Sequence, residues 1–237
     1  MRVRQRLPGW VPGSTKPQLP ASLRLIEDLR EESLLVVPLA TSEAARLRMP
    51  VGHPRPNVLY IGDPVEPARY YPAADFHRRV FERKFAEAMR LVMALGATEV
   101  RVRWEKGWRG ELVGDLQAPI QKLLKGAGQL RASAEKKSSL LFEATLEPQE
   151  PRLPENLLWY PYEDLWQAVA DGRLKGKLRQ FDLTVSSSDD YGVDSTFQAK
   201  VKRKNLLSLG GEFEAHKATT WRLQGNFAPR KRVLFGR

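Results

Sequence analysis

The chain has 237 residues, of which 42% are hydrophobic and 28% are charged, a composition typical of folded globular proteins. It contains no cysteine, which excludes disulfides and thiolate-bound zinc or iron–sulfur clusters and favours a reducing compartment, so we expect a cytoplasmic protein. With 39 lysines and arginines against 28 aspartates and glutamates the formal net charge is +11, which predicts an anionic partner.

The N-terminal region predicts neither a signal peptide nor a membrane span. Residues 1–20 are basic and are interrupted by prolines and glycines where a signal peptide needs an apolar stretch, so we expect an extended basic arm. The longest apolar stretches, such as residues 34–39, are far shorter than the roughly 20 residues that cross a bilayer.

Short elements are predicted after this arm. Residues 22–30 can form a short helix capped by Ser22. The apolar runs 34–37 and 58–61 indicate two neighbouring buried strands.

The strongest signal is a helix over residues 73–95, which follows Pro72 and ends at Gly96, in the C′ position. Arginines and glutamates alternate on its polar side, which predicts pairs along the helix such as Arg83 with Glu87. The core-facing stripe, at spacings of four and three, consists of Phe81, Phe85, Ala88, Val92 and Leu95.

A strand with one wet face follows directly, because the apolar side chains of residues 100, 102 and 104 alternate with charged ones. Pro119 is expected to start a short helix. Residues 130–134 and 140–146 then predict a hairpin, and residues 163–172 predict another helix that ends at Gly172.

The remainder is expected to be β-rich. Apolar residues alternate with polar ones over 181–185 and again over 197–201, with a turn at 189–192 between them, and a last strand lies within 213–227. The predicted fold class is α+β: a mixed sheet with one long helix in the N-terminal part, and an antiparallel, hairpin-rich C-terminal part. We divide the chain into the arm 1–20, an α/β sub-region 21–155 and a β-rich basic sub-region 156–237, which we expect to form one compact body.

The basic excess is concentrated toward the C-terminus, where residues 172–237 hold 14 basic and 6 acidic side chains. Lys200, Lys202 and Lys204 recur at period two, so on a strand they would form a lysine ladder with about 7 Å between ammonium groups, close to the spacing of phosphates. The alternative is that Glu212 and Glu214 on the next strand neutralise this ladder as cross-strand ion pairs.

Basic and aromatic residues together define the predicted interface. Tyr191, in a turn, is the aromatic residue that we expect to stack on bases, whereas Trp104, Trp159, Trp166 and Trp221 are expected in the core. The predicted nucleic-acid-binding residues are Lys175, Lys177, Arg179, Lys200, Lys202, Lys204, Tyr191, Arg230, Lys231 and Arg232.

Catalytic signals are weak, and no cofactor motif is present. The three histidines, His53, His77 and His216, lie far apart in the sequence. A metal-dependent nuclease could combine Asp182 or Asp194 with Lys200, but Gln198 stands where a further acid would be needed.

Four functions therefore stay open. The leading hypothesis is a non-enzymatic nucleic-acid-binding protein that uses a basic face on an antiparallel sheet. The alternatives are a membrane-active, oligomerising protein that inserts residues 140–146 and 181–201 into anionic lipid, a structural subunit of a larger assembly or homo-oligomer, and the nuclease.

Overall fold

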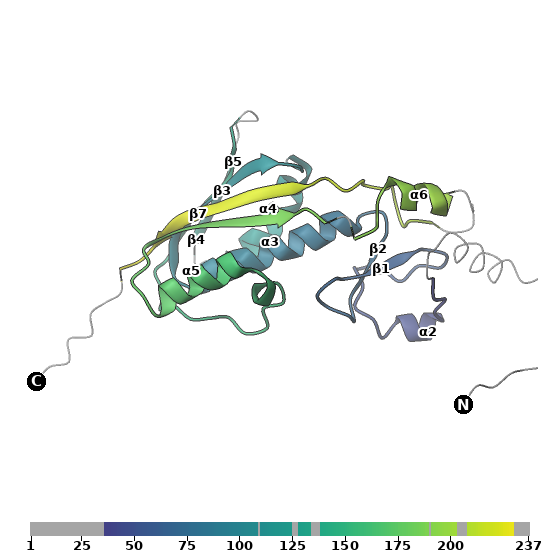
Figure 1. The fold of residues 1–237 in the computed structure, drawn as a ribbon, viewed down its shortest axis with the longest axis horizontal. Helices are drawn as coiled ribbons and strands as arrows, with labels where there is room; N and C mark the ends of the chain where they lie inside the picture. The colour runs from purple at the N-terminus through teal and green to yellow at the C-terminus, as the bar shows by residue number, and fades with distance from the viewer. Residues whose placement is uncertain are drawn as a thin grey trace, which may run out of the picture.

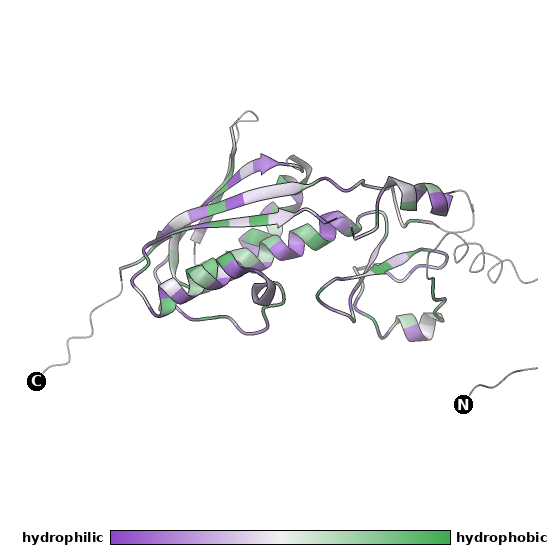
Figure 2. Cartoon of the chain, in the orientation of Figure 1, coloured by the Kyte–Doolittle hydropathy of each residue, from purple (hydrophilic) through white to green (hydrophobic). Residues whose placement is uncertain are grey.

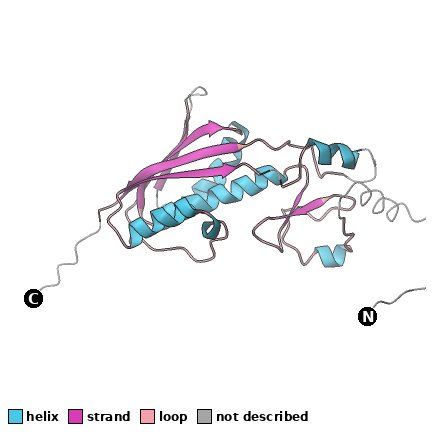
Figure 3. Cartoon of the chain, in the orientation of Figure 1, coloured by secondary structure: helices cyan, strands magenta, loops and turns pink. Residues whose placement is uncertain are grey.

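The computed structural model describes residues 36–108, 110–124, 128–133, 138–189, 191–202 and 208–229. They form two layers, with a five-stranded antiparallel sheet and helices on one of its faces (Figures 1 and 3). The predicted α+β class is confirmed. The predicted arm and the helix over residues 22–30 lie outside the described residues, as do residues 34 and 35 of the first predicted strand.

The strand order in the sheet is β4-β5-β3-β7-β6, and every neighbouring pair is antiparallel. The predicted hairpin is confirmed as β4 and β5. Because β3 lies beside β7, strands from both predicted sub-regions share this one sheet. The strands are β3 (Ala97–Lys106), β4 (Gly128–Ala132), β5 (Leu140–Leu146), β6 (Gln180–Ser187) and β7 (Thr219–Phe227).

Helix α3 (Phe76–Ala94) confirms the long predicted helix. All five residues of its predicted stripe are buried, and Gly96 follows it with φ +81, the left-handed conformation expected at C′. The Trp221 ring of β7 packs on Phe81 and Phe85, with ring centroids 5.3 and 5.1 Å away. Figure 2 shows hydrophobic and hydrophilic residues alternating around this helix.

Two further helices complete the layer over the sheet: α4 (Gly110–Leu124) and α5 (Asp164–Leu174). The prediction that Pro119 starts a helix is wrong, because Pro119 lies inside α4. The buried side chains of Leu112, Leu116 and Ile120 join the core from both sides of this proline. Within the described residues, no helix is both long and apolar enough to cross a bilayer.

Two side chains from the helical layer reach the backbone of edge strand β6. Trp166 of α5 donates its indole N–H to the carbonyl of Thr184 (3.1 Å), and Lys84 of α3 donates its ammonium to the carbonyl of Ser186 (3.0 Å). Lys84 also pairs with Glu163 just before α5. These contacts fix α3 and α5 against the outer edge of the sheet.

A small hairpin lies at the N-terminal end of α3 and is formed by β1 (Tyr60–Gly62) and β2 (Tyr70–Pro72), with α2 (Thr41–Ala44) close by in Figure 1. The predicted strand over 58–61 is thus found two residues later than expected at its start. Its partner is β2 and not the run 34–37, since residues 36–40 are not in a strand.

An ionic cluster joins this hairpin to α3. The Asp63 carboxylate is fully buried and accepts the amides of Val65 and Glu66, the Tyr71 hydroxyl and the Arg83 guanidinium. Arg83 also binds Glu66 (2.6 Å). The predicted Arg83–Glu87 pair is wrong, because Arg83 binds Asp63 and Glu66 instead. These two carboxylates lie in the turn between β1 and β2, which the sequence pattern alone does not place beside α3.

Glu66 receives two more arginines, Arg48 and Arg69, and its side chain is only 11% exposed. Burial alone would raise the pKa of Glu66, but hydrogen bonds from Arg69 and Arg48 and the charge of Arg83 outweigh it and lower this pKa from 4.5 to about 2. The stabilisation is therefore fully present above pH 4.5 and is lost as the pH falls through about 2.

Replacing Glu66 by glutamine is expected to lower the free energy of unfolding at neutral pH by about 2 kcal/mol. The difference from the unsubstituted protein should shrink as the carboxylate is protonated in both states. Urea unfolding at about pH 7, 4 and 3 measures this trend. A penalty that stays constant over that range would contradict the assignment of the stabilisation to the Glu66 charge.

Candidate nucleic-acid interface

The predicted lysine ladder is wrong, because residues 195–202 form a helix, α6 (Ser195–Lys202), and not a strand. The Asp194 carboxylate accepts the amide of Phe197 (2.8 Å), which lowers the pKa of Asp194 and caps the helix start. Phe197 and Val201, four residues apart, are the buried positions of α6. Lys200 and Lys202 lie in its last turn, whereas Lys204 lies outside the described residues.

The alternative that Glu212 and Glu214 neutralise a ladder on a neighbouring strand is wrong as well, because residues 212–218 are not in a strand. The Glu214 carboxylate lies 3.0 Å from the Arg78 guanidinium of α3. Glu214 therefore ties this segment to the long helix.

Three of the predicted cations, Lys175, Lys177 and Arg179, lie between the end of α5 and the start of β6. Lys175 pairs with Asp171 one turn earlier in α5 (3.0 Å). Lys177 and Arg179 are exposed, and among the described residues no carboxylate lies within ion-pair distance of either. They line an open groove of about 660 Å³ together with Leu178, Gln180, Asn226, Phe227 and Pro229.

The groove is closed on one side by the end of β7, since the Phe227 amide donates to the Arg179 carbonyl (2.8 Å). Pro229 is the last described residue, and Arg230, Lys231 and Arg232 follow it in the sequence and lie outside the described residues. The pairing of β6 with β7 thus brings residues 175–179 to the same end of the sheet as Ala228 and Pro229, the residues that precede 230–232 in the sequence.

Arg173, which the sequence did not mark, holds this end of the molecule together. Its guanidinium is buried and donates to three carbonyls, those of Leu95 (3.0 Å), Leu178 (3.2 Å) and Ala228 (2.9 Å). It also lies over the Phe227 ring, 4.8 Å from the centroid. Arg173 thereby positions the loop with Lys177 and Arg179 against the end of β7.

Tyr191 lies at the other end of the sheet, near α6. Its backbone has φ 50, uncommon for a non-glycine residue, and its ring packs edge-on against Phe76 with centroids 5.9 Å apart. Burial, and then the nearby charge of Asp189, raise the pKa of Tyr191. The residue is 38% exposed, but it is not part of the groove around Lys177 and Arg179.

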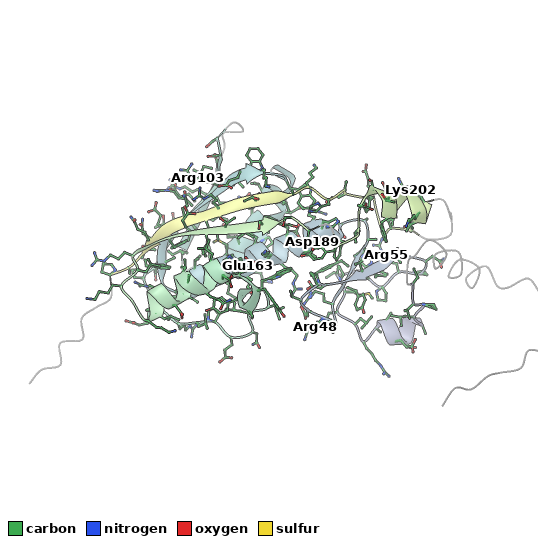
Figure 4. All side chains as sticks on the ribbon, in the orientation of Figure 1. Arg48, Arg55, Arg103, Glu163, Asp189 and Lys202 are labelled. Atoms are coloured by element: carbon green, nitrogen blue, oxygen red, sulfur yellow. The ribbon has the colours of Figure 1, made fainter. Side chains whose placement is uncertain are left out.

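The open face of the sheet does not supply the basic face that the leading hypothesis needed. Its charges alternate in sign and pair across strands: Arg101 binds Glu143 (3.0 Å), and Arg222 binds Asp182 (3.1 Å). Trp159, Trp166 and Trp221 are buried, as predicted, and Trp104 is partly buried against the core. Arg103 is the side chain at the upper end of the sheet that Figure 4 labels; it contacts Ser139 (3.2 Å).

The described residues are almost electrically balanced. They contain 23 lysines and arginines against 22 aspartates and glutamates, so ten of the eleven excess positive charges lie in the segments outside the described ranges. The net charge of the protein is therefore a property of particular segments and not of the folded surface as a whole.

The nuclease hypothesis requires acids that together hold a metal ion. In the part of the chain that the structure describes, no three histidine, aspartate or glutamate side chains lie close enough to hold a metal ion. Asp182 is engaged by Arg222 and Gln224, and Asp194 caps α6, so the two acids of the nuclease hypothesis have separate structural roles.

No family model, curated protein or solved structure matches the chain.

Proposed function

We propose that the protein is a non-enzymatic nucleic-acid-binding protein whose contacts come from basic groups at the ends of the fold and not from the open face of the sheet. The observation that carries this proposal is the groove with Lys177 and Arg179. Both cations are exposed and lack a carboxylate partner among the described residues, and Arg230–Arg232 follow directly from the groove's last residue, Pro229. A cytoplasmic location is part of the proposal and rests on the absence of cysteine.

Phosphate groups are the anions that suit this site best. Lys177 and Arg179 are two residues apart and line the same groove, as contacts with neighbouring phosphates of one strand would require. The groove is also lined by the amide side chains of Gln180 and Asn226, and the Asn226 amide already donates to Glu99 (2.8 Å). The lining therefore offers no arrangement of donors that would select one base over another. We therefore expect binding that depends strongly on salt and weakly on sequence.

Fluorescence anisotropy with labelled single- and double-stranded DNA and RNA tests the proposal. Affinity should fall steeply as salt rises from about 50 to 200 mM. The double variant Lys177→Glu/Arg179→Glu is expected to weaken binding about tenfold or more and to reduce the salt slope by about two.

The matched control is Lys122→Glu/Arg131→Glu, which makes the same change in net charge at two exposed sites on α4 and β4. It should keep most of the affinity. An equal loss in both double variants would mean that net charge and not the groove governs binding, and absence of binding at about 50 mM salt would overturn the proposal. Anionic vesicles in the same assay test the membrane alternative, and light scattering tests assembly.

A further inference from the structure

A second pair of cations lies at the opposite end of the fold. Lys202 ends α6 and Arg55 belongs to the loop before β1, and both side chains are exposed. The loop with Arg55 is joined through the backbone to the segment that resumes after α6, since the amide of Ser208 donates to the carbonyl of Asn57 (2.8 Å). Figure 4 shows both labelled residues at the α6 end, and Figure 1 shows the C-terminal end of β7 on the other side of the molecule.

Helix α3 sets the distance between the two ends. Its C-terminal end is bound by Arg173 through the Leu95 carbonyl, next to the groove. At its N-terminal end, the Ala74 amide donates to the carbonyl of Leu209, next to the α6 segment (2.8 Å). Because α3 has 19 residues, the ends are about 28 Å apart, about three and a half Debye lengths at physiological salt. Charges at one end are therefore screened from charges at the other.

The surface between the ends does not favour a continuous track for phosphates. On the open sheet face Arg101 and Arg222 are paired with acids, and those acids, Glu143 and Asp182, stay about 40% exposed. On the side of α3 and α5, Glu163 and Asp189 occupy the middle of the view in Figure 4. One nucleic-acid strand that ran from end to end would pass these carboxylates, whereas two separate segments would avoid them.

We propose that the protein bridges two nucleic-acid segments, one held at the Lys177–Arg179 groove and the other at the Lys202–Arg55 end. This inference rests on the proposed function and adds to it a second site and a linking activity. Both sites recognise phosphates, so bridging should be independent of sequence and should be lost at high salt.

Hairpin duplexes of about six base pairs are too short to reach both ends, since about eight base pairs span 28 Å. With one hairpin immobilised and another fluorescently labelled, the protein is expected to capture the labelled hairpin on the immobilised one. The hairpin-to-protein ratio at saturation should be two. Lys177→Glu/Arg179→Glu and Lys202→Glu/Arg55→Glu should each abolish capture and reduce the ratio to one, whereas Lys122→Glu/Arg131→Glu should leave both unchanged.

Light scattering and urea unfolding check the oligomeric state and the folding of each variant. If the Arg55 change alters folding, Lys202→Glu alone replaces the double variant. A ratio of one that only the groove variant abolishes would overturn bridging and leave the proposed function intact. Capture by a dimer with one site per chain would also overturn bridging by a single chain. In that case the Lys202 and Arg55 changes would leave capture of the labelled hairpin unchanged. No binding of any hairpin would overturn both proposals.

Discussion

Replacing Glu87 by alanine is expected to lower the free energy of unfolding by about 4 kcal/mol. The buried carboxylate of Glu87 accepts three consecutive backbone amides, those of Leu158 (2.8 Å), Trp159 (2.7 Å) and Tyr160 (2.9 Å). Its removal leaves amides without an acceptor where α3 meets the segment before α5, and each such buried donor costs about 1–3 kcal/mol. The loss also loosens Trp159, which packs under Lys84.

The midpoint of urea unfolding measures the change, and the melting temperature should fall by roughly 8–16 °C at this chain length. Glu87→Gln keeps one acceptor oxygen and should cost about half as much. Glu155→Ala, at an exposed position in the same segment, is the matched control and should change stability by less than about 0.5 kcal/mol. Equal effects at positions 87 and 155 would contradict the role of the three amides.

Replacing Arg83 by leucine is the second large expected effect, a loss of about 3–5 kcal/mol. The guanidinium is the cation that meets the fully buried Asp63 carboxylate, and its loss leaves that charge in the interior with only dipolar partners. The damage should be greatest at the β1–β2 hairpin. Hydrogen exchange of the Tyr70 amide, which donates to the Arg48 carbonyl, should accelerate more than exchange within β3.

A double variant separates charge burial from packing. Arg83→Leu/Asp63→Asn removes both charges, and asparagine can still accept the amides of Val65 and Glu66, so it should be more stable than Arg83→Leu alone. Arg46→Leu, at an exposed position near α2, is the control. A double variant as unstable as the single one would mean that the Arg83 side chain acts through packing.

The sequence predicted the elements whose pattern is long. Nineteen residues of α3 repeat their apolar stripe over several turns, and the buried side chains of β7 share one parity from Trp221 to Phe227. Residues 197–201 were wrongly assigned to a strand, because Phe197 and Val201 are four residues apart and this separation fits one face of a strand as well as one face of a helix. The N-terminal cap at Asp194 was the signal that favours the helix.

The site could be predicted only in part. The basic residues of the α5–β6 loop were visible as charges, but the groove that Lys177 and Arg179 line depends on the pairing of β6 with β7. The helix α6 separates these two strands in the sequence, and strand order cannot be read from local patterns. The roles of Arg173 and Arg83 could not be predicted for the same reason. Their acceptors lie as far as 78 residues away, so nothing near them in the sequence distinguishes them from solvated arginines.

The contacts of Trp166 and Lys84 with β6 also determine how the sheet can meet other chains. The amide of Phe227 donates to the Arg179 carbonyl, so the even-numbered residues of β6 point their backbone groups away from β7. A strand that added to this edge would need the carbonyls of Thr184 and Ser186, and both already accept side-chain donors. The protein thereby protects half of an exposed edge against intermolecular sheet extension, which would otherwise lead to aggregation at high concentration.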